Sequence, residues 1–244
     1  MDAVIQTNIL VGRVIRHIKY LGLSVAEAKS EAVLFSRKRI PALPKIRIGG
    51  SVITAQHSMK YLGVMVDGLW SFTDHFRYIE SKTAKVVRAL GRIMPNLKGP
   101  SEHKRRLFGH VVTSVVMYAA PVWGRELAGL NNRHARVLRQ LQRTIVLRTI
   151  AGYRSISFDA ATLLSRSVPW VLLASCKCRV YDRVKDLRST LDYSQEAERN
   201  IQVEEEILML RQWEMTLLSP PGAGEPLMLS YLTLKSGSEE SSDH

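Results

Sequence analysis

One predicted helix carries arginine side chains at a spacing suited to binding phosphate groups. These arginines are Arg133, Arg136, Arg139 and Arg143, here called the arginine row. At about 100° per residue they share one helical face, and no acidic residue occurs between Glu126 and Asp159. Guanidinium groups without carboxylates at i,i+4 repel one another unless a polyanion neutralises them, as a nucleic-acid backbone would. The alternative interpretation is a basic face that is merely solvated.

Two further basic clusters precede the arginine row. The first surrounds a predicted hairpin and consists of Arg37, Lys38, Arg39, Lys45 and Arg47. The second begins a predicted helix and consists of Lys104, Arg105 and Arg106. Each cluster by itself is equally well explained as a solvated surface. Together with the arginine row, the clusters would allow a continuous basic groove for nucleic acid.

The charge of the chain is divided unevenly. The 244 residues include 35 Lys and Arg and 22 Asp and Glu, a net charge of +13. Residues 1–188 hold 32 basic and 11 acidic side chains, whereas residues 189–244 hold 3 and 11. A basic body indicates a polyanionic partner. The acidic segment would be able to cover the basic face, in which case deleting residues 189–244 should tighten RNA binding.

The residue types needed for most catalytic centres are missing from the sequence. Two-metal phosphoryl transfer needs carboxylates that hold ions about 3.5–4 Å apart, yet adjacent aspartates occur nowhere. A Gly-rich phosphate loop, a Gly-x-Ser-x-Gly elbow and a His-Glu-x-x-His motif are absent too. The seven histidines are scattered, and Cys176 and Cys178 supply at most half of a zinc site. We therefore expect no catalytic centre, no metal site and no cofactor.

Composition restricts the class of protein. With 45% apolar residues the chain can bury a core, which excludes a wholly disordered protein. Two cysteines exclude a disulfide scaffold. The first residues lack a secretory signal pattern, and the longest apolar stretch, about residues 111–123, is shorter than the ~18–20 residues that span a bilayer. We expect an intracellular protein, nuclear or cytoplasmic, without a membrane partner.

Hydrophobic periodicity predicts a mixed segment followed by helices. The mixed segment consists of a helix at about 4–21 and strands at 31–36, 46–48, 52–54 and 59–66. The helices are expected at about 73–94, 101–121, 131–150, 158–164, 169–187 and 195–215, the last of them acidic. The predicted fold class is α+β. Residues 219–226 are too rich in Pro and Gly for regular structure, and 236–244 are expected to be disordered.

Five sequence motifs resemble one family of enzymes. They are GLSVAEAKSEAVLF (22–35), KYLGVMVD (60–67) with WSFTDH (70–75), ALGRIMPN (89–96), VMYAAPVW (116–123), and QRTI (142–145) with AGYRSIS (151–157). In this order they resemble the reverse transcriptase of LINE-type (non-LTR) retrotransposons, and most nearly the arthropod elements that insert at specific sites. The resemblance covers about residues 10–190.

The resemblance implies a domain organisation and roles for several residues. It implies a partial polymerase palm with the palm–thumb hairpin at 1–72 and an all-α thumb and post-thumb region at 73–190. Periodicity and composition assign the remainder to an acidic helix at 191–216 and a disordered tail at 217–244. Lys29 matches a palm lysine on the leaving-group side of catalysis. Tyr61 and Gly63 fall in the hairpin that grips the primer end. The arginine row falls where relatives contact template–primer phosphates.

The departures from the family imply that this chain does not polymerise alone. The Tyr/Phe-x-Asp-Asp box, the fingers and the endonuclease would lie upstream of Met1, and the downstream Cys/His knuckle is missing. Without the aspartates there is no site for Mg²⁺, which would belong only to the complete enzyme. We expect a polymerase fragment that binds RNA or an RNA–DNA duplex, without a small-molecule substrate. The alternatives are a non-enzymatic basic RNA-binding module and an inert transposon-derived remnant without a stable partner.

Overall fold

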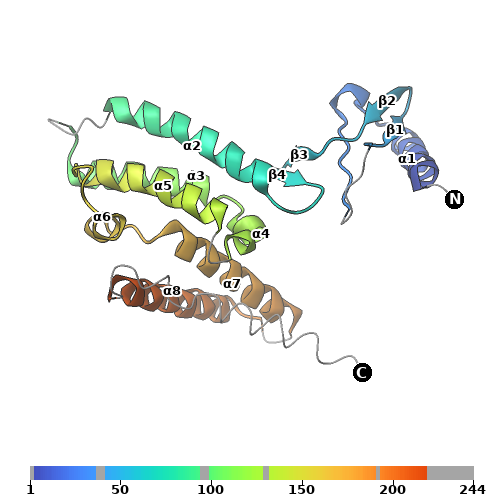
Figure 1. Ribbon diagram of the computed structural model, residues 1–244. Helices are drawn as coiled ribbons and strands as arrows, with labels where there is room; N and C mark the ends of the chain where they lie inside the picture. The colour runs from blue at the N-terminus through green and yellow to red at the C-terminus, as the bar shows by residue number, and fades with distance from the viewer. Residues whose placement is uncertain (1–2, 37–41, 94–98, 129–131, 191–192, 219–244) are drawn as a thin grey trace. The chain divides into compact units, whose positions relative to one another are not determined.

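A computed structural model describes residues 3–36, 42–93, 99–128, 132–190 and 193–218 (Figure 1). The chain divides into two compact units, Met1–Tyr78 and Ile79–His244. With 66% of residues in helices and 9% in strands, the fold class is α+β, as predicted.

The first unit is built from one long helix and two hairpins. Helix α1 (Ala3–Tyr20) and the short 3₁₀ turn η1 (Glu27–Lys29) precede strands β1 (Lys45–Ile48) and β2 (Ser51–Thr54), then β3 (Ser58–Tyr61) and β4 (Val64–Asp67). Both pairs are antiparallel. The hairpin predicted around Gly49-Gly50 is confirmed. The backbone N–H of Arg47 donates to the Asn8 side chain at 2.8 Å, which ties β1 to α1.

The carboxylate of Glu27 fixes the turn of the first hairpin. It accepts hydrogen bonds from the Gly50 backbone N–H at 3.1 Å and from the Ser51 hydroxyl at 2.7 Å. The Ser51 hydrogen bond, followed by that of Gly50, lowers the pKa of Glu27. Glu27 therefore stays ionised and links η1 to the β1–β2 turn.

Two strand predictions differ from the structure. Residues 31–36 are extended, but only Val33 forms a bridge, which is parallel to Gln56, so the predicted strand is absent. The predicted strand 59–66 is folded back on itself, because Leu62 (φ 46°) and Gly63 (φ 88°) both adopt left-handed conformations. Positive φ at both central residues makes the tight turn typical of a two-residue hairpin. The side-chain pattern of a strand does not reveal such a turn.

The second unit is helical. Its elements are α2 (Thr73–Ile93), whose first residues belong to the first unit, α3 (Glu102–Val116), α4 (Ala120–Trp123), η2 (Gly124–Leu127), α5 (Arg133–Thr149), α6 (Phe158–Ser165), α7 (Trp170–Ser189) and α8 (Gln195–Leu218). The predicted helix 101–121 is wrong at its end. Ala119 adopts a left-handed φ of 53°, and Pro121 lies in the first turn of a new helix, α4. The other predicted helices are confirmed to within a few residues.

Two tryptophans occupy the core of the second unit. Trp123 and Trp170 are 0% and 1% exposed. The Trp170 indole N–H donates to the Thr113 hydroxyl at 3.0 Å, and that of Trp123 donates to the Tyr118 carbonyl at 2.9 Å. Both rings thus bury their apolar area without leaving a donor unsatisfied. Gly124 permits close packing of η2 on α7, since a Cβ there would lie 2.7 Å from Cys178 Sγ.

A buried glutamine joins α5 to the beginning of α7. Gln142 is 1% exposed. Its amide donates to the Val168 carbonyl at 2.8 Å and to the Ser167 hydroxyl at 3.2 Å, and its carbonyl accepts from the Trp170 backbone N–H at 2.8 Å. The side chain therefore satisfies one of the backbone N–H groups that every helix leaves unpaired at its N-terminus.

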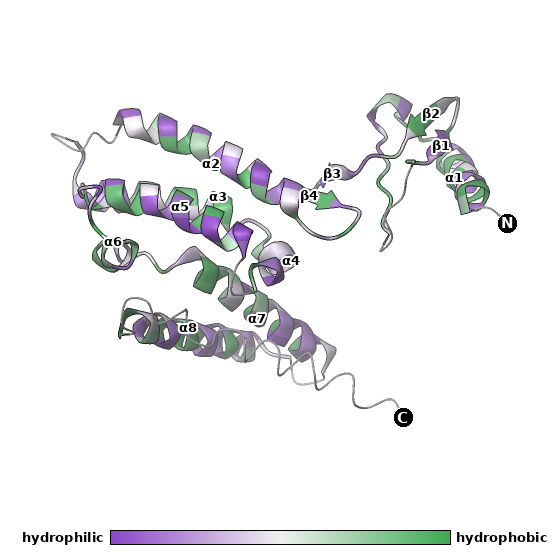
Figure 2. Cartoon of the chain, viewed as in Figure 1, coloured by the Kyte–Doolittle hydropathy of each residue, from purple (hydrophilic) through white to green (hydrophobic). Residues whose placement is uncertain are grey.

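Helix α8 packs along α7, and ion pairs reinforce the contact (Figure 1). Glu205 receives hydrogen bonds from Arg179 at 2.5 Å and Arg183 at 3.1 Å. Leu172, Cys176 and Met209 form the apolar part of the contact. Hydrophobic and hydrophilic segments alternate along α8 in Figure 2.

In the described parts of the chain, a membrane-spanning length of apolar residues is not reached by any single helix. By length and composition alone, a bent pair would reach it, namely α3 with Ala120–Leu127, which meet at 52°.

Candidate nucleic-acid interface

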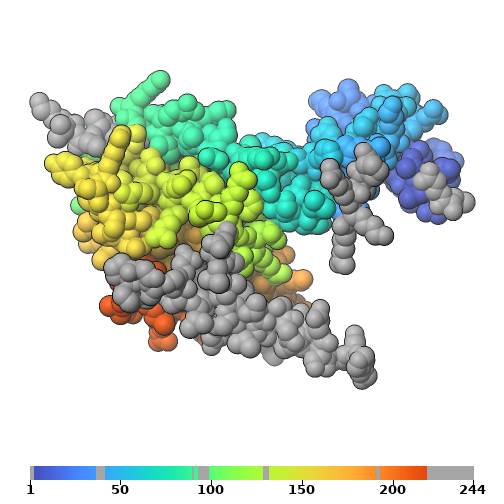
Figure 3. Space-filling model, in the orientation of Figure 1, coloured from blue at the N-terminus to red at the C-terminus, as the bar shows by residue number. Residues whose placement is uncertain are grey.

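The arginine row lies on the outward side of α5. Asn132 caps this helix, because its side chain accepts from the backbone N–H groups of His134 and Ala135 at 2.8 and 3.2 Å. The buried side of α5 consists of Leu138, Gln142, Ile145, Val146 and Thr149. Of the row, Arg133, Arg136 and Arg139 are exposed and Arg143 is half-buried. Figure 3 shows α5, coloured yellow-green to yellow, forming part of the surface of the second unit.

Two members of the arginine row have partners within the chain. The Arg139 guanidinium lies over the Phe158 ring at 4.6 Å from its centroid and 3.5 Å from the Asp159 carboxylate. Arg143 donates to the Arg154 carbonyl at 2.7 Å. As expected, the row has no acidic neighbour within its own helix, but the fold brings the Asp159 carboxylate beside Arg139. Since both partners of the Arg139–Asp159 pair are 47% exposed, the pair is weak and leaves the row strongly basic.

The burial of Arg105 argues against its predicted contact with nucleic acid. Arg105 is only 5% exposed. Its guanidinium donates to the Pro100 carbonyl at 2.9 Å and to the Arg148 carbonyl at 3.0 Å, so it stabilises the C-terminal end of α5. Of its neighbours, Lys104 is exposed, and Arg106 is half-buried and pairs with Glu102 at 2.5 Å.

The first unit contains the other predicted site residues. Lys29 is exposed at the end of η1. Tyr61 is 60% exposed at the end of β3, and Gly63 lies in the tight turn that follows. Ser58 donates to the Asp74 carboxylate at 2.7 Å, which anchors this hairpin to the first turn of α2.

The basic cluster around the first hairpin is only partly described. Lys45 and Arg47 are exposed on β1. Arg37, Lys38 and Arg39 lie outside the described residues.

A basic face on α2 was missed by the sequence analysis. Lys85, Arg88 and Arg92 are exposed and lie three and four residues apart, so they share one side of the helix. Their spacing is the same signal that identified the arginine row. Near Gly91 of α2, a Cβ would collide with the Arg148 guanidinium, so α2 passes close to α5 within the second unit.

The acidic segment pairs with α7. Glu204 and Glu205 bind Arg183, and Glu198 binds Arg188 at 3.3 Å. The idea that the acidic segment covers the arginine row is therefore not supported for α8, whose carboxylates make these ion pairs with α7. Residues 219–244 lie outside the described residues.

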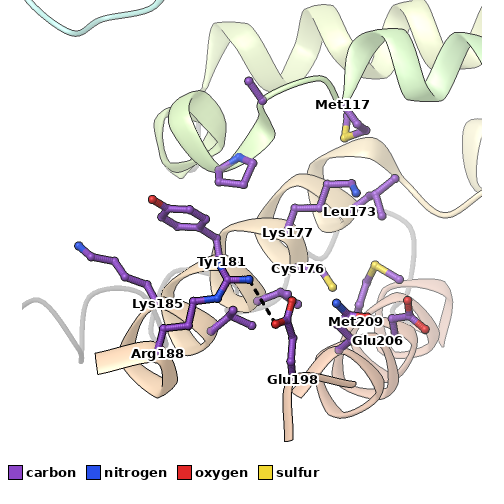
Figure 4. A pocket seen from close by; sticks show the side chains of 15 residues that line it. Met117, Leu173, Cys176, Lys177, Tyr181, Lys185, Arg188, Glu198, Glu206 and Met209 are labelled. Carbon is purple, nitrogen blue, oxygen red and sulfur yellow. Dashed lines mark hydrogen bonds and ion pairs between the residues drawn. The ribbon is translucent and has the colours of Figure 1, made fainter. Parts of the chain in front are cut away.

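A pocket of about 730 Å³ lies between α4, α7 and α8 (Figure 4). Met117, Leu173 and Met209 line its apolar part, and Lys177 and the Arg188–Glu198 pair lie at its polar side. Its residue types fit packing better than chemistry, since its one lining thiol, Cys176, has a pKa that burial raises.

The two thiols are expected to be unreactive in the native protein. Burial raises the pKa of Cys178 to about 11, and only the thiolate is nucleophilic. Against the ordinary value of 9.0, this lowers the thiolate fraction at neutral pH by about 100-fold. Iodoacetamide labelling followed by mass spectrometry should show Cys178 reacting about 100-fold more slowly than in guanidinium chloride. Native labelling within tenfold of the unfolded rate would contradict this burial.

Metal-binding geometry is lacking in the described ranges. Nowhere among those residues do three or more His, Cys, Asp or Glu side chains converge so that they could hold a metal ion. The described residues therefore do not fit a Mg²⁺ site.

Comparison with known proteins finds relatives among mobile elements. This chain is 30% identical to the retrovirus-related Pol polyprotein from type-1 retrotransposable element R1 4 of Nasonia vitripennis. The match extends over 127 residues, which are 51% of this chain and 31% of that protein. Over 177 residues (68%) this chain is 27% identical to the corresponding R1 2 polyprotein, covering 42%. This chain is retrotransposon-derived. The R1 polyprotein of Bradysia coprophila is 27% identical over 54% of the chain.

This retrotransposon-derived chain spans less than half the length of the relatives it matches. No protein-family model matches it, and no solved structure matches it. The resemblance to retrotransposon proteins is thus confirmed. The more specific assignment, to the palm and thumb of a reverse transcriptase, goes beyond these matches and stays a prediction.

Proposed function

We propose that this chain is the template–primer-binding part of a retrotransposon RNA-directed DNA polymerase, and that it does not catalyse synthesis by itself. The observation that supports this most is the arginine row, which lies on the outward side of a capped and well-packed helix. Similarity to Pol polyproteins supports the polymerase origin. The ligand would be RNA or an RNA–DNA duplex.

The geometry of α5 suits a phosphate backbone. From Arg133 to Arg143 the helix rises about 15 Å, so the row is long enough to meet several successive phosphates. Arg139 and Arg143 are held in place by Phe158 and by the Arg154 carbonyl, which reduces the entropy lost on binding. Lys85, Arg88 and Arg92 of α2 add positive charge within the same unit.

Residues of the first unit would serve the polymerase in a different way. By the resemblance, Lys29 would act on the leaving-group side and Tyr61 and Gly63 would approach the primer end. Lys29 and Tyr61 are exposed, as such contacts require. We assign no step of synthesis to this chain.

Reversing the charge of the arginine row should abolish most nucleic-acid binding. We expect Arg136→Glu/Arg139→Glu/Arg143→Glu to weaken binding of a labelled RNA–DNA duplex by about 100-fold or more. It should also reduce the slope of log K against log [salt] by about 3, one for each lost phosphate contact. Fluorescence anisotropy over a series of KCl concentrations measures both quantities.

A matched control separates a specific site from general charge. Arg13→Glu/Arg16→Glu/Lys19→Glu on α1 changes the net charge equally, and these side chains are exposed. An equal loss in both variants would show that the row is not the site. Template-dependent primer extension by the wild-type chain with Mg²⁺ or Mn²⁺ would contradict the non-catalytic role.

A further inference from the structure

The side of α8 that faces away from α7 is also apolar. Val203, Ile207 and Leu210 are 54%, 46% and 49% exposed, whereas Glu205 and Met209 are buried against α7. The helix thus has two apolar faces, and within the described part of the chain no element packs on the outer one with more than incidental contact.

The outer residues follow the spacing of a coiled-coil seam. Val203, Ile207 and Leu210 are separated by four and three residues, and Leu217 extends the heptad by seven more. This period keeps the side chains along one stripe that a second helix can cover. Glu214 occupies one seam position near the C-terminal end of the helix.

The charges beside the seam are complementary to a second copy of the same helix. If two α8 helices run antiparallel with Ile207 facing Leu210 of the second copy, Glu204 falls beside Arg211 of that copy. The two-fold symmetry then repeats the same pair. Both side chains are exposed, and Glu204 is held beside the seam by Arg183 of its own chain at 2.6 Å.

We propose that two copies of this chain associate through the outer face of α8, with the two helices antiparallel. A parallel pair would bring Glu214 of both copies together at a seam position, where like charges repel. The antiparallel pair places Glu214 opposite Val203 of the second copy, near the end of the seam. Because the seam is short, its area falls at the low end of specific interfaces, and dissociation in the micromolar range is expected.

Sedimentation velocity of the full chain across the micromolar range tests the dimer. Ile207→Lys should raise the dissociation constant about tenfold or more, because it buries a charge in the seam. The matched control is Leu164→Lys on α6, which changes a 57% exposed leucine in the same way and should leave association unchanged. Circular dichroism verifies that both variants remain helical.

Two results would overturn the proposal. One is a wild-type chain that stays monomeric throughout the micromolar concentration range, as it would if residues 219–244 or another partner covered the seam. The other is equal weakening by both lysine variants. Orientation is tested by mixing chains that carry Val203→Cys with chains that carry Glu214→Cys. Mixed disulfides support the antiparallel pair, whereas Val203→Cys chains that cross-link with themselves would contradict it.

Discussion

Replacing Gln142 with leucine is expected to destabilise the second unit by about 2–4 kcal/mol. The substitution preserves side-chain bulk but removes the hydrogen bonds to the Val168 carbonyl and the Trp170 N–H. A buried backbone group left without a partner costs about 1–3 kcal/mol. Thermal unfolding followed by circular dichroism should show a fall in Tm of several degrees.

The control for this prediction lies on the same helix. Gln140 is exposed, so Gln140→Leu should change stability by less than about 0.5 kcal/mol. If the two variants unfolded at the same temperature, the network around Gln142 would not stabilise the junction of α5 and α7. A loss of helix content in Gln142→Leu before the main transition would locate the damage at the start of α7.

Replacing Glu205 with alanine is expected to cost about 2–3 kcal/mol and to loosen α8 from α7. The Glu205 side chain is 7% exposed and accepts from Arg179 and Arg183. Removing one member of a buried ion pair leaves the other charge uncompensated. The cost is at the lower end because Arg183 is 37% exposed. Urea unfolding measures it, and Glu206→Ala, at the exposed neighbouring position, should be nearly neutral.

Glu205 also makes the stability of the protein depend on pH. Burial alone would raise the pKa of Glu205, but the hydrogen bonds from Arg179 and Arg183 outweigh it and lower the pKa below its ordinary value of 4.5. A lowered pKa adds stability above pH 4.5, and this stability is lost as the pH falls through the folded-state pKa. The difference between wild type and Glu205→Ala should therefore shrink on acidification below pH 4.5. A difference that stays constant would contradict the ion pair.

Local patterns predicted most of the elements. Helix periodicity located α2, α5, α7 and α8, and Gly49-Gly50 located the first hairpin, because such signals depend on neighbouring residues. The side-chain pattern did not predict the tight turn at Leu62, since a leucine with positive φ contradicts its own preference, and only the family resemblance placed a hairpin there.

The candidate site was predictable only in part. Helical spacing is enough to identify the arginine row, and the same three- and four-residue spacing would have identified the basic face of α2. The pairing of Arg139 with Asp159 and the burial of Arg105 depend on which helices pack together. Residues 20 and 43 apart in sequence meet in these contacts, and no periodic pattern encodes that. A polar residue such as Gln142 on a buried helix face likewise has meaning only once Val168 and Trp170 are beside it.

The enclosure of two indole rings gives the second unit a fluorescence signal of its own. Trp123 and Trp170 are almost wholly shielded from solvent, Trp213 of the same unit is half-buried, and Trp70 of the first unit is 52% exposed. Shielded indoles emit at shorter wavelength and are poorly reached by dissolved quenchers, and a half-exposed ring behaves oppositely. The short-wavelength part of the intrinsic fluorescence therefore comes from the second unit alone, so the loss of structure in that unit is readable without any label.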